Sequence, residues 1–280
     1  MAIQIITDST ADIPNETIKQ LSIRIIPVYV RFGDKTYRDG LDIKSEEFYS
    51  MLESSPVHPA TSQPNPEDFI KVYDEFDASD GIVSLHVSSR LSGTYNSALT
   101  AKKMIGGKYP IEIIDSKFTS FGLGLITIAV AKMAQAGADM HMILDEAHQA
   151  ISQIRMFGMF EHMKYLARSG RVSKAIASAS NFLNVMPLLT FHEGELTRAG
   201  FVRRIEKGMD RIYDYVKNNL PISELAIVHS AVIERAELLK ERCADFIDEE
   251  KITITQLGSS LGVHGGPGVL LIAARHSEYT

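Results

Sequence analysis

The sequence predicts an α/β protein made of two α/β domains. The chain has 280 residues, longer than the usual single domain, and 45% of them are hydrophobic, which is enough for sizeable cores. In the first half, short apolar strands alternate with helical patterns, which is typical of a mainly parallel sheet. Later, a hairpin turn introduces an antiparallel pair and so predicts a mixed sheet. We expect an N-terminal domain of residues 1–155 and a C-terminal domain of residues 156–280.

The first half begins as strand, polar loop and helix, and this order recurs. Gly33 and Asp34 mark a hairpin turn, because glycine adopts positive φ without strain. Four prolines between residues 56 and 66 predict an extended loop, since proline fixes φ and lacks an N–H donor. Strands are expected at 3–7, 23–30, 82–86 and 111–114, and helices at 15–21, 45–52, 67–76, 121–136 and 139–154, with a further helical segment that follows the stretch 87–98 and reaches Met104.

In the second half, residues 192–195 form a turn between two strand candidates, which predicts an antiparallel hairpin. Methionine and phenylalanine are frequent in the middle of the chain, where they suit either ordinary core packing or an adaptable apolar ligand site. Strands are expected at 185–191, 196–202, 224–229, 252–256 and 269–274, and helices at 206–218 and 233–246.

Composition argues against several classes of function. The net charge is 29 minus 35, or −6, and no block of Lys and Arg offsets it, so a nucleic-acid surface is not expected. Cys243 is the single cysteine, which rules out an intramolecular disulfide and cysteine-cluster metal sites and fits a reducing cytoplasm. The histidines show no metal-ligand spacing. Neither a signal peptide nor a membrane-spanning segment is expected, and we predict a cytoplasmic protein.

The segment 87–98 carries the densest group of hydroxyls and precedes a helix pattern. Ser92, Gly93 and Thr94 could together bind a carboxylate or phosphate, because the first N–H groups of a helix have no intrahelical partners. Serine and threonine are also ordinary helix caps, so capping alone is the alternative. Two other strand candidates end in similar hydroxyl-rich turns. In parallel sheets ligands bind beyond the carboxyl ends of the strands, which favours a site there.

Other polar residues stand out near glycines or in small basic clusters. His264 lies in a run with four glycines, which allows close approach of a ligand but is equally consistent with a tight interstrand loop carrying a chance histidine. Arg168, Arg171 and Arg203 belong to short basic clusters in an acidic protein. Arginine suits phosphates and acidic partners, whereas solvated surface side chains are the alternative.

Common catalytic motifs are absent from the sequence. Arg90 stands where the nucleophile elbow of a serine hydrolase requires glycine. The chain contains no phosphate-binding loop and no complete dinucleotide-binding fingerprint, so a nucleotide cofactor has no evident site. A small-ester hydrolase that uses Ser92 as nucleophile and His264 as base remains the alternative enzymatic hypothesis.

Six motifs taken in order closely resemble the DegV family, bacterial fatty-acid-binding proteins that include the FakB subunits of fatty acid kinase. The resemblance runs nearly from end to end of the chain. Its motifs are Thr7-Asp8-Ser9, Thr61-Ser62-Gln63-Pro64, residues 88–94, Ile114-Asp115-Ser116, Arg168-Ser169-Gly170-Arg171-Val172 and the glycine run around His264.

The resemblance implies a fatty acid between the two domains, with its chain in a buried tunnel. Thr61 and Ser92 would hold the carboxylate, with Ser62, the Gly93 amide and His264 nearby. Arg168, Arg171 and Arg203 would face the headgroup or a partner. The ligand would be palmitate, stearate or oleate, and no cofactor or metal would be needed. The protein would be a carrier that presents the acid to an ATP-dependent fatty acid kinase subunit, which makes the acyl phosphate for phospholipid synthesis.

Two positions depart from the family pattern. The chain has Met186-Pro187 where the family usually has a Lys-Pro pair, and Ser169 where a second glycine is common. We expect these changes to alter the pocket or the partner surface.

Overall fold

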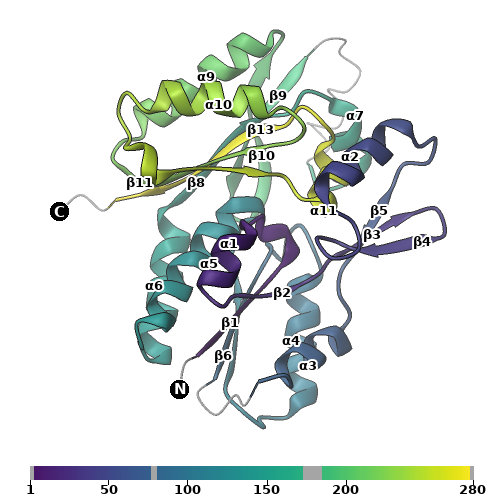
Figure 1. Cartoon of the computed structure of the whole chain (residues 1–280), viewed down its shortest axis with the longest axis vertical. Coiled ribbons are helices and arrows are strands. Elements are labelled where there is room, and N and C mark those ends of the chain that lie inside the picture. The colour runs from purple at the N-terminus through teal and green to yellow at the C-terminus, as the bar shows by residue number, and fades with distance from the viewer. Residues whose placement is uncertain (1–2, 77–80, 173–184, 278–280) are drawn as a thin grey trace.

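The computed structural model describes residues 3–76, 81–172 and 185–277. In this part of the chain, three sheets and their helices form the two-domain α/β fold that the sequence predicts (Figure 1). No helix among the described residues is long and apolar enough to cross a membrane.

The first sheet is entirely parallel and has the strand order β2-β1-β6-β7. Its side chains alternate between two faces. One face packs against α3 and α4, and the other packs against α5. The elements are β1 (Gln4–Asp8), α1 (Asn15–Gln20), β2 (Arg24–Ile26), α3 (Pro66–Tyr73), β6 (Ile82–His86), α4 (Thr94–Ile105), β7 (Ile111–Asp115), α5 (Ser120–Gln135) and α6 (Met140–Gln153).

The second sheet is mixed and has the order β10-β9-β8-β13-β11-β12. Only β11 and β12 pair in parallel; the other neighbours are antiparallel. Helices α9 and α10 cover one face (Figure 1). The elements are β8 (Ile154–Met159), β9 (Met186–His192), β10 (Glu195–Val202), α9 (Ile205–Asn218), β11 (Ile222–His229), α10 (Ile233–Cys243), β12 (Ile252–Gln256) and β13 (Leu270–His276).

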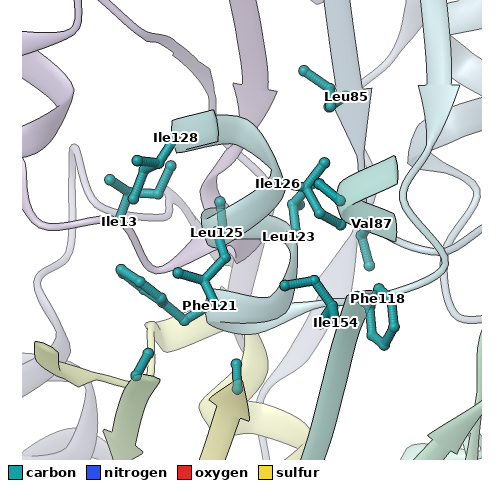
Figure 2. Close-up of a cluster of buried hydrophobic side chains, with 14 of the residues drawn as sticks. Ile13, Leu85, Val87, Phe118, Phe121, Leu123, Leu125, Ile126, Ile128 and Ile154 are labelled. Carbon is teal, nitrogen blue, oxygen red and sulfur yellow. The ribbon is translucent and has the colours of Figure 1, made fainter. Parts of the chain in front are cut away.

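Helix α5 lies between the two large sheets and joins their cores. Every residue from Ser120 to Ala131 is buried, as expected of a helix that is apolar on all sides. Figure 2 shows its side chains beside Leu85 and Val87, in and just after β6 of the first sheet, and Ile154 of β8 in the second sheet. One continuous apolar cluster therefore spans both halves of the chain.

A third, small sheet was not expected. Its order is β4-β3-β5, and all pairings are antiparallel. The predicted strand at 23–30 is divided by Pro27, which has no N–H for a ladder: β2 stays in the parallel sheet, whereas β3 enters the small one. The small sheet consists of β3 (Tyr29–Phe32), β4 (Lys35–Arg38) and β5 (Ala60–Ser62), and it packs with α2 (Ser45–Ser54), α7 (Met163–Ser169) and α11 (Ser259–Gly265).

The proline-rich segment is therefore not a loop throughout. Its centre, Ala60–Ser62, pairs with Tyr29, Val30 and Arg31, while Pro59 and Pro64 stay outside the strand. The two predicted hairpin turns are present: Gly33 has a φ of +57°, and Glu193 and Gly194 have φ values of +46° and +83°.

Candidate functional site

Three strand ends of the parallel sheet contribute to one pocket beside the small sheet. Thr10 follows β1, Val87 and Ser92 follow β6, and Thr119 follows β7. The carboxyl ends of parallel strands lie at the same edge of a sheet, which is where α/β proteins bind ligands. The hydroxyl-rich turns predicted to form a site are thus brought together.

The pocket has a wide polar outer part and a narrow apolar inner part. The outer cavity measures about 450 Å³ and includes Ser62, Gln63 and Gly93 in its wall. The inner cavity measures about 80 Å³. Its apolar wall is made by Val28, Val87, Leu91, Leu196 and Leu261. Thr61, Ser92 and Arg171 line both parts and so mark the junction between polar and apolar surroundings.

The junction contains a hydrogen bond between Thr61 and His264. Thr61 Oγ1 on β5 lies 2.9 Å from His264 Nε2 on α11. Burial lowers the pKa of His264 to about 3, and the positive charge of Arg171 adds to this effect. The imidazole is therefore neutral near pH 7. In the tautomer with Nε2–H it donates to Thr61, whose own hydroxyl proton is then available for an anion.

Helix α11 is fixed at its first turn by two buried carboxylates from the N-terminal half. Asp39 accepts from the Ser259 amide at 3.2 Å and from the Ser260 hydroxyl at 2.6 Å. Asp12 accepts from the Gly258 amide at 2.9 Å. These bonds satisfy N–H groups that a helix N-terminus leaves without partners. Burial raises the pKa of both carboxyls. Asp12 and Asp39 thereby set the position of His264.

The hydroxyls of Ser92 and Thr94 are hydrogen-bonded to each other. Their Oγ and Oγ1 atoms lie 2.8 Å apart, and the Thr94 amide donates to Ser92 Oγ at 3.3 Å. Gly93 and Gln63 are in close contact: a Cβ on Gly93 would lie 2.2 Å from the end of the Gln63 side chain, which would have to move. Gly93 is the N-cap residue of α4 and has no side chain with which to cap the helix, whereas Ser92 and Gly93 line the pocket, so the interpretation as a site is the one that the structure favours.

The three candidate arginines lie in different places. Arg171 lines the pocket, whereas Arg168, on α7, lines a separate one. Arg203 is exposed before α9 and lines neither of these two pockets. Ser169 holds the turn between the first two: its hydroxyl donates to the Leu166 carbonyl at 2.7 Å and accepts from the Arg171 amide at 3.1 Å.

The sequence left two interpretations of the glycine run around His264 open: close approach of a ligand, or a tight interstrand loop. The structure shows a helix there rather than a simple loop, because Ser259–Gly265 form helix α11, and the chain leaves it at Gly266 with a φ of +73°. The helix forms because Asp12 and Asp39, far away in sequence, cap it. His264 thus lies in the last turn of a helix.

Several residues of the site could not be recognised from the sequence. Gln63 adjoins Gly93, and Leu196 comes from the distant β9–β10 hairpin. That hairpin is held at its tip by Ser88, whose hydroxyl donates to the Gly194 carbonyl at 2.7 Å.

The motif Thr7-Asp8-Ser9 at the end of β1 has a structural role. The Asp8 carboxylate accepts a hydrogen bond from the Val87 amide at 2.9 Å and so connects β1 to the residue that follows β6.

The geometry does not pair Ser92 with His264 as a nucleophile and its base. Ser92 bonds to Thr94, His264 bonds to Thr61, and an imidazole with a pKa of about 3 is a weak base. No group of three or more His, Cys, Asp or Glu side chains in the described ranges could hold a metal ion.

A family model described as "Uncharacterised protein, DegV family" matches residues 2–276. The chain belongs to the DegV family. It is 36% identical over 272 residues to a DegV domain-containing protein of Caldanaerobacter subterraneus subsp. tengcongensis, with 95% of each chain covered. It is 30% identical to the protein DegV of Bacillus subtilis, covering 96% of this chain and 98% of that protein.

Solved DegV structures share this fold. One of them is a DegV family protein from Thermus thermophilus whose structure is described as showing fatty acid binding. It has a TM-score of 0.89 and 28% sequence identity to this chain, and the match covers 98% of this chain and 99% of that one. The structure of DegV from Bacillus subtilis, described as a fatty acid binding protein, gives a TM-score of 0.87 at 29% identity, with the same shares covered.

Proposed function

We propose that this protein binds one long-chain fatty acid, such as palmitate, stearate or oleate, between an N-terminal domain of residues 1–155 and a C-terminal domain of residues 156–280. The observation that carries the proposal is the arrangement of the pocket: hydroxyls and an imidazole stand at the junction of a polar outer cavity and an apolar inner one. A molecule with a carboxylate at one end and a hydrocarbon chain at the other fits this arrangement.

The carboxylate would be held by Thr61 and Ser92, with Ser62, the Gly93 amide and His264 close by. With the His264 proton on Nε2, the neutral imidazole donates a hydrogen bond to the Thr61 hydroxyl, which in turn donates a hydrogen bond to the carboxylate. Arg171 supplies a positive charge at the same junction. A charged imidazole is not needed, because the hydroxyls and the guanidinium provide the donors.

The chain would supply most of the affinity. Burying about 15 methylenes at ~0.8 kcal/mol each gives roughly 12 kcal/mol before the costs of binding, whereas each hydrogen bond to a carboxylate contributes about 1.5–3 kcal/mol. The inner cavity of about 80 Å³ is smaller than a long acyl chain, so the tail must separate apolar side chains that now touch. Among the apolar residues of the wall, Leu196 and Leu261 do not belong to the parallel-sheet half.

The carboxylate would then be accessible to a partner. The outer cavity of about 450 Å³ lies at the polar end of the site, whereas the inner cavity is lined mainly by apolar side chains. We propose that the protein is a cytoplasmic carrier without an activity of its own, and that it presents the acid to an ATP-dependent fatty acid kinase subunit. That subunit would form the acyl phosphate for phospholipid synthesis. Arg171, which lines the pocket, is the candidate contact for the headgroup, and Arg168 and Arg203, which lie outside it, are candidate contacts for the kinase.

Native mass spectrometry tests the binding step. Protein purified without detergent should carry one acyl chain, and protein stripped of lipid should take up one equivalent of added oleate. Absence of any acyl chain together with failure to take up oleate would refute the proposal. Formation of acyl phosphate from the loaded protein, ATP and the cognate kinase subunit tests the second step separately.

A further inference from the structure

A second pocket lies apart from the acyl site, between the end of α2 and helix α7. Its volume is about 500 Å³, within the range of small-molecule sites. Basic and imidazole side chains dominate its polar wall: His58, His162, Lys164 and Arg168, against the single carboxylate of Glu53. The wall of this pocket therefore carries more basic than acidic side chains, although the net charge of the whole chain is −6.

The two cations of this pocket are not neutralised by the protein. Lys164 and Arg168 are one helical turn apart on α7, so their side chains extend from the same face. Among the described residues neither forms an ion pair. Burial lowers the pKa of His58, and the positive charges of Arg168 and Lys164 lower it further. The pocket is therefore electropositive even with neutral imidazoles.

The floor of the pocket is a fixed aromatic ring. Tyr165 is 6% exposed, and its ring centroid lies 5.7 Å from that of His58 and 6.2 Å from that of His162. Lys164 Nζ lies 4.9 Å from the same centroid. Gly266 packs so closely on this ring that a Cβ would lie 2.1 Å from it. His58, His162 and Lys164 thus lie around the tightly packed ring of Tyr165.

We propose that this pocket binds the phosphate group of a small anionic ligand, at a site distinct from the fatty acid carboxylate. Lys164 and Arg168 would neutralise the phosphate, and the ring N–H groups of His58 and His162 would donate hydrogen bonds to its oxygens. Tyr165 limits the depth to which the ligand enters.

The pocket adjoins the acyl site through α11. Gly266, which packs on Tyr165, is two residues after His264, which bonds to Thr61. A phosphate in this pocket would therefore add negative charge near the C-terminal end of α11, which carries His264. The proposal does not require that a fatty acid be bound.

Histidine NMR tests the site with inorganic phosphate as the probe, in delipidated protein at constant ionic strength adjusted with chloride. The ring signals of His58 and His162, assigned with His58→Gln and His162→Gln, should shift and saturate. The double variant Lys164→Gln/Arg168→Gln should bind at least about tenfold more weakly, the loss expected for about 1.4 kcal/mol of charge-assisted bonding.

The matched control is Lys103→Gln/Arg31→Gln, which removes the same two charges from exposed positions outside the pocket and should bind phosphate like the unmodified protein. A second titration with AMP separates the sources of the phosphate. Tighter binding of AMP with the same dependence on Lys164 and Arg168 indicates a phosphate carried by a larger molecule, whereas binding of inorganic phosphate alone indicates the free ion. If neither probe gives a saturable shift, or if the double variant binds like the control, the proposal is refuted.

Discussion

Thr61 Oγ1 and His264 Nε2 lie 2.9 Å apart although 203 residues separate them in the chain. The threonine comes from a short edge strand in the N-terminal half and the histidine from the last turn of α11. This bond joins the two halves at the junction of the polar and apolar cavities. The proposed carboxylate site therefore depends on the packing of the small sheet against α11.

Replacing Thr61 by valine should weaken fatty acid binding without unfolding the protein. Valine has nearly the same shape but no hydroxyl, so one hydrogen bond to the carboxylate is lost, and about 1.5–3 kcal/mol corresponds to roughly a 10- to 100-fold lower affinity. Displacement of a fluorescent fatty acid from delipidated protein measures this. Thr100→Val, on the exposed face of α4, is the control and should bind like the unmodified protein. Equal affinity of the two variants would remove Thr61 from the site.

Ser92→Ala should lower affinity and transfer but leave the fold intact. Ser92 Oγ bonds to Thr94 and lines both cavities, so its loss removes a donor at the carboxylate. Oleate affinity, acyl phosphate formation with the kinase subunit, and thermal unfolding together measure the effect, with Ser152→Ala on α6 as the control. A fluorophosphonate probe should not label Ser92. Covalent labelling that disappears in Ser92→Ala would instead support the ester hydrolase.

His264 should make the folded protein less stable in acid. Its pKa is about 3 in the folded chain against an ordinary value of 6.5, so between these values the unfolded chain binds a proton that the folded chain does not. Stability due to this group is lost as the pH falls from about 6.5 toward 3. The raised pKa values of Asp12 and Asp39 act in the opposite direction, because there the folded chain binds the extra protons.

The His264→Gln variant isolates this contribution. Its free energy of unfolding should decline less steeply than that of the unmodified protein between about pH 6.5 and pH 4, as measured by urea denaturation. His141→Gln, which removes an imidazole from an exposed position on α6, should keep the original steepness. An unchanged slope in His264→Gln would show that the buried imidazole is not held neutral by the fold.

Asp39→Asn should displace α11 and with it His264. The carboxylate accepts hydrogen bonds from Ser9, Ser259 and Ser260. The amide of asparagine would place its NH₂ group against one of these N–H or O–H groups, so that hydrogen bond would be lost. We expect a loss of about 1–3 kcal/mol in stability and weaker oleate binding even where the variant is fully folded. The His264 ring signals in NMR should move as well. Asp34→Asn in the exposed β3–β4 turn is the control, and a loss of stability with unchanged His264 signals and unchanged binding would limit Asp39 to a purely structural role.

The sequence alone determined much of this protein. Periodicity and turn chemistry predicted the parallel strands, the helices that follow them and both hairpin turns, because these depend on neighbours in the chain. The helix predicted at 121–136 is present as α5, which begins at Ser120 and ends at Gln135. The motifs around Thr61, Ser92 and His264 also identified residues that the fold brings to one pocket.

Only the tertiary structure decided how these pieces meet. Ala60–Ser62 is a strand because β3 pairs with it, and Ser259–Gly265 is a helix because Asp12 and Asp39 cap it from the other half of the chain. Arg168 and Arg171 are neighbours in one motif, yet they line different pockets. Such contacts join residues far apart in sequence, and their energies depend on packing and burial that no local pattern contains.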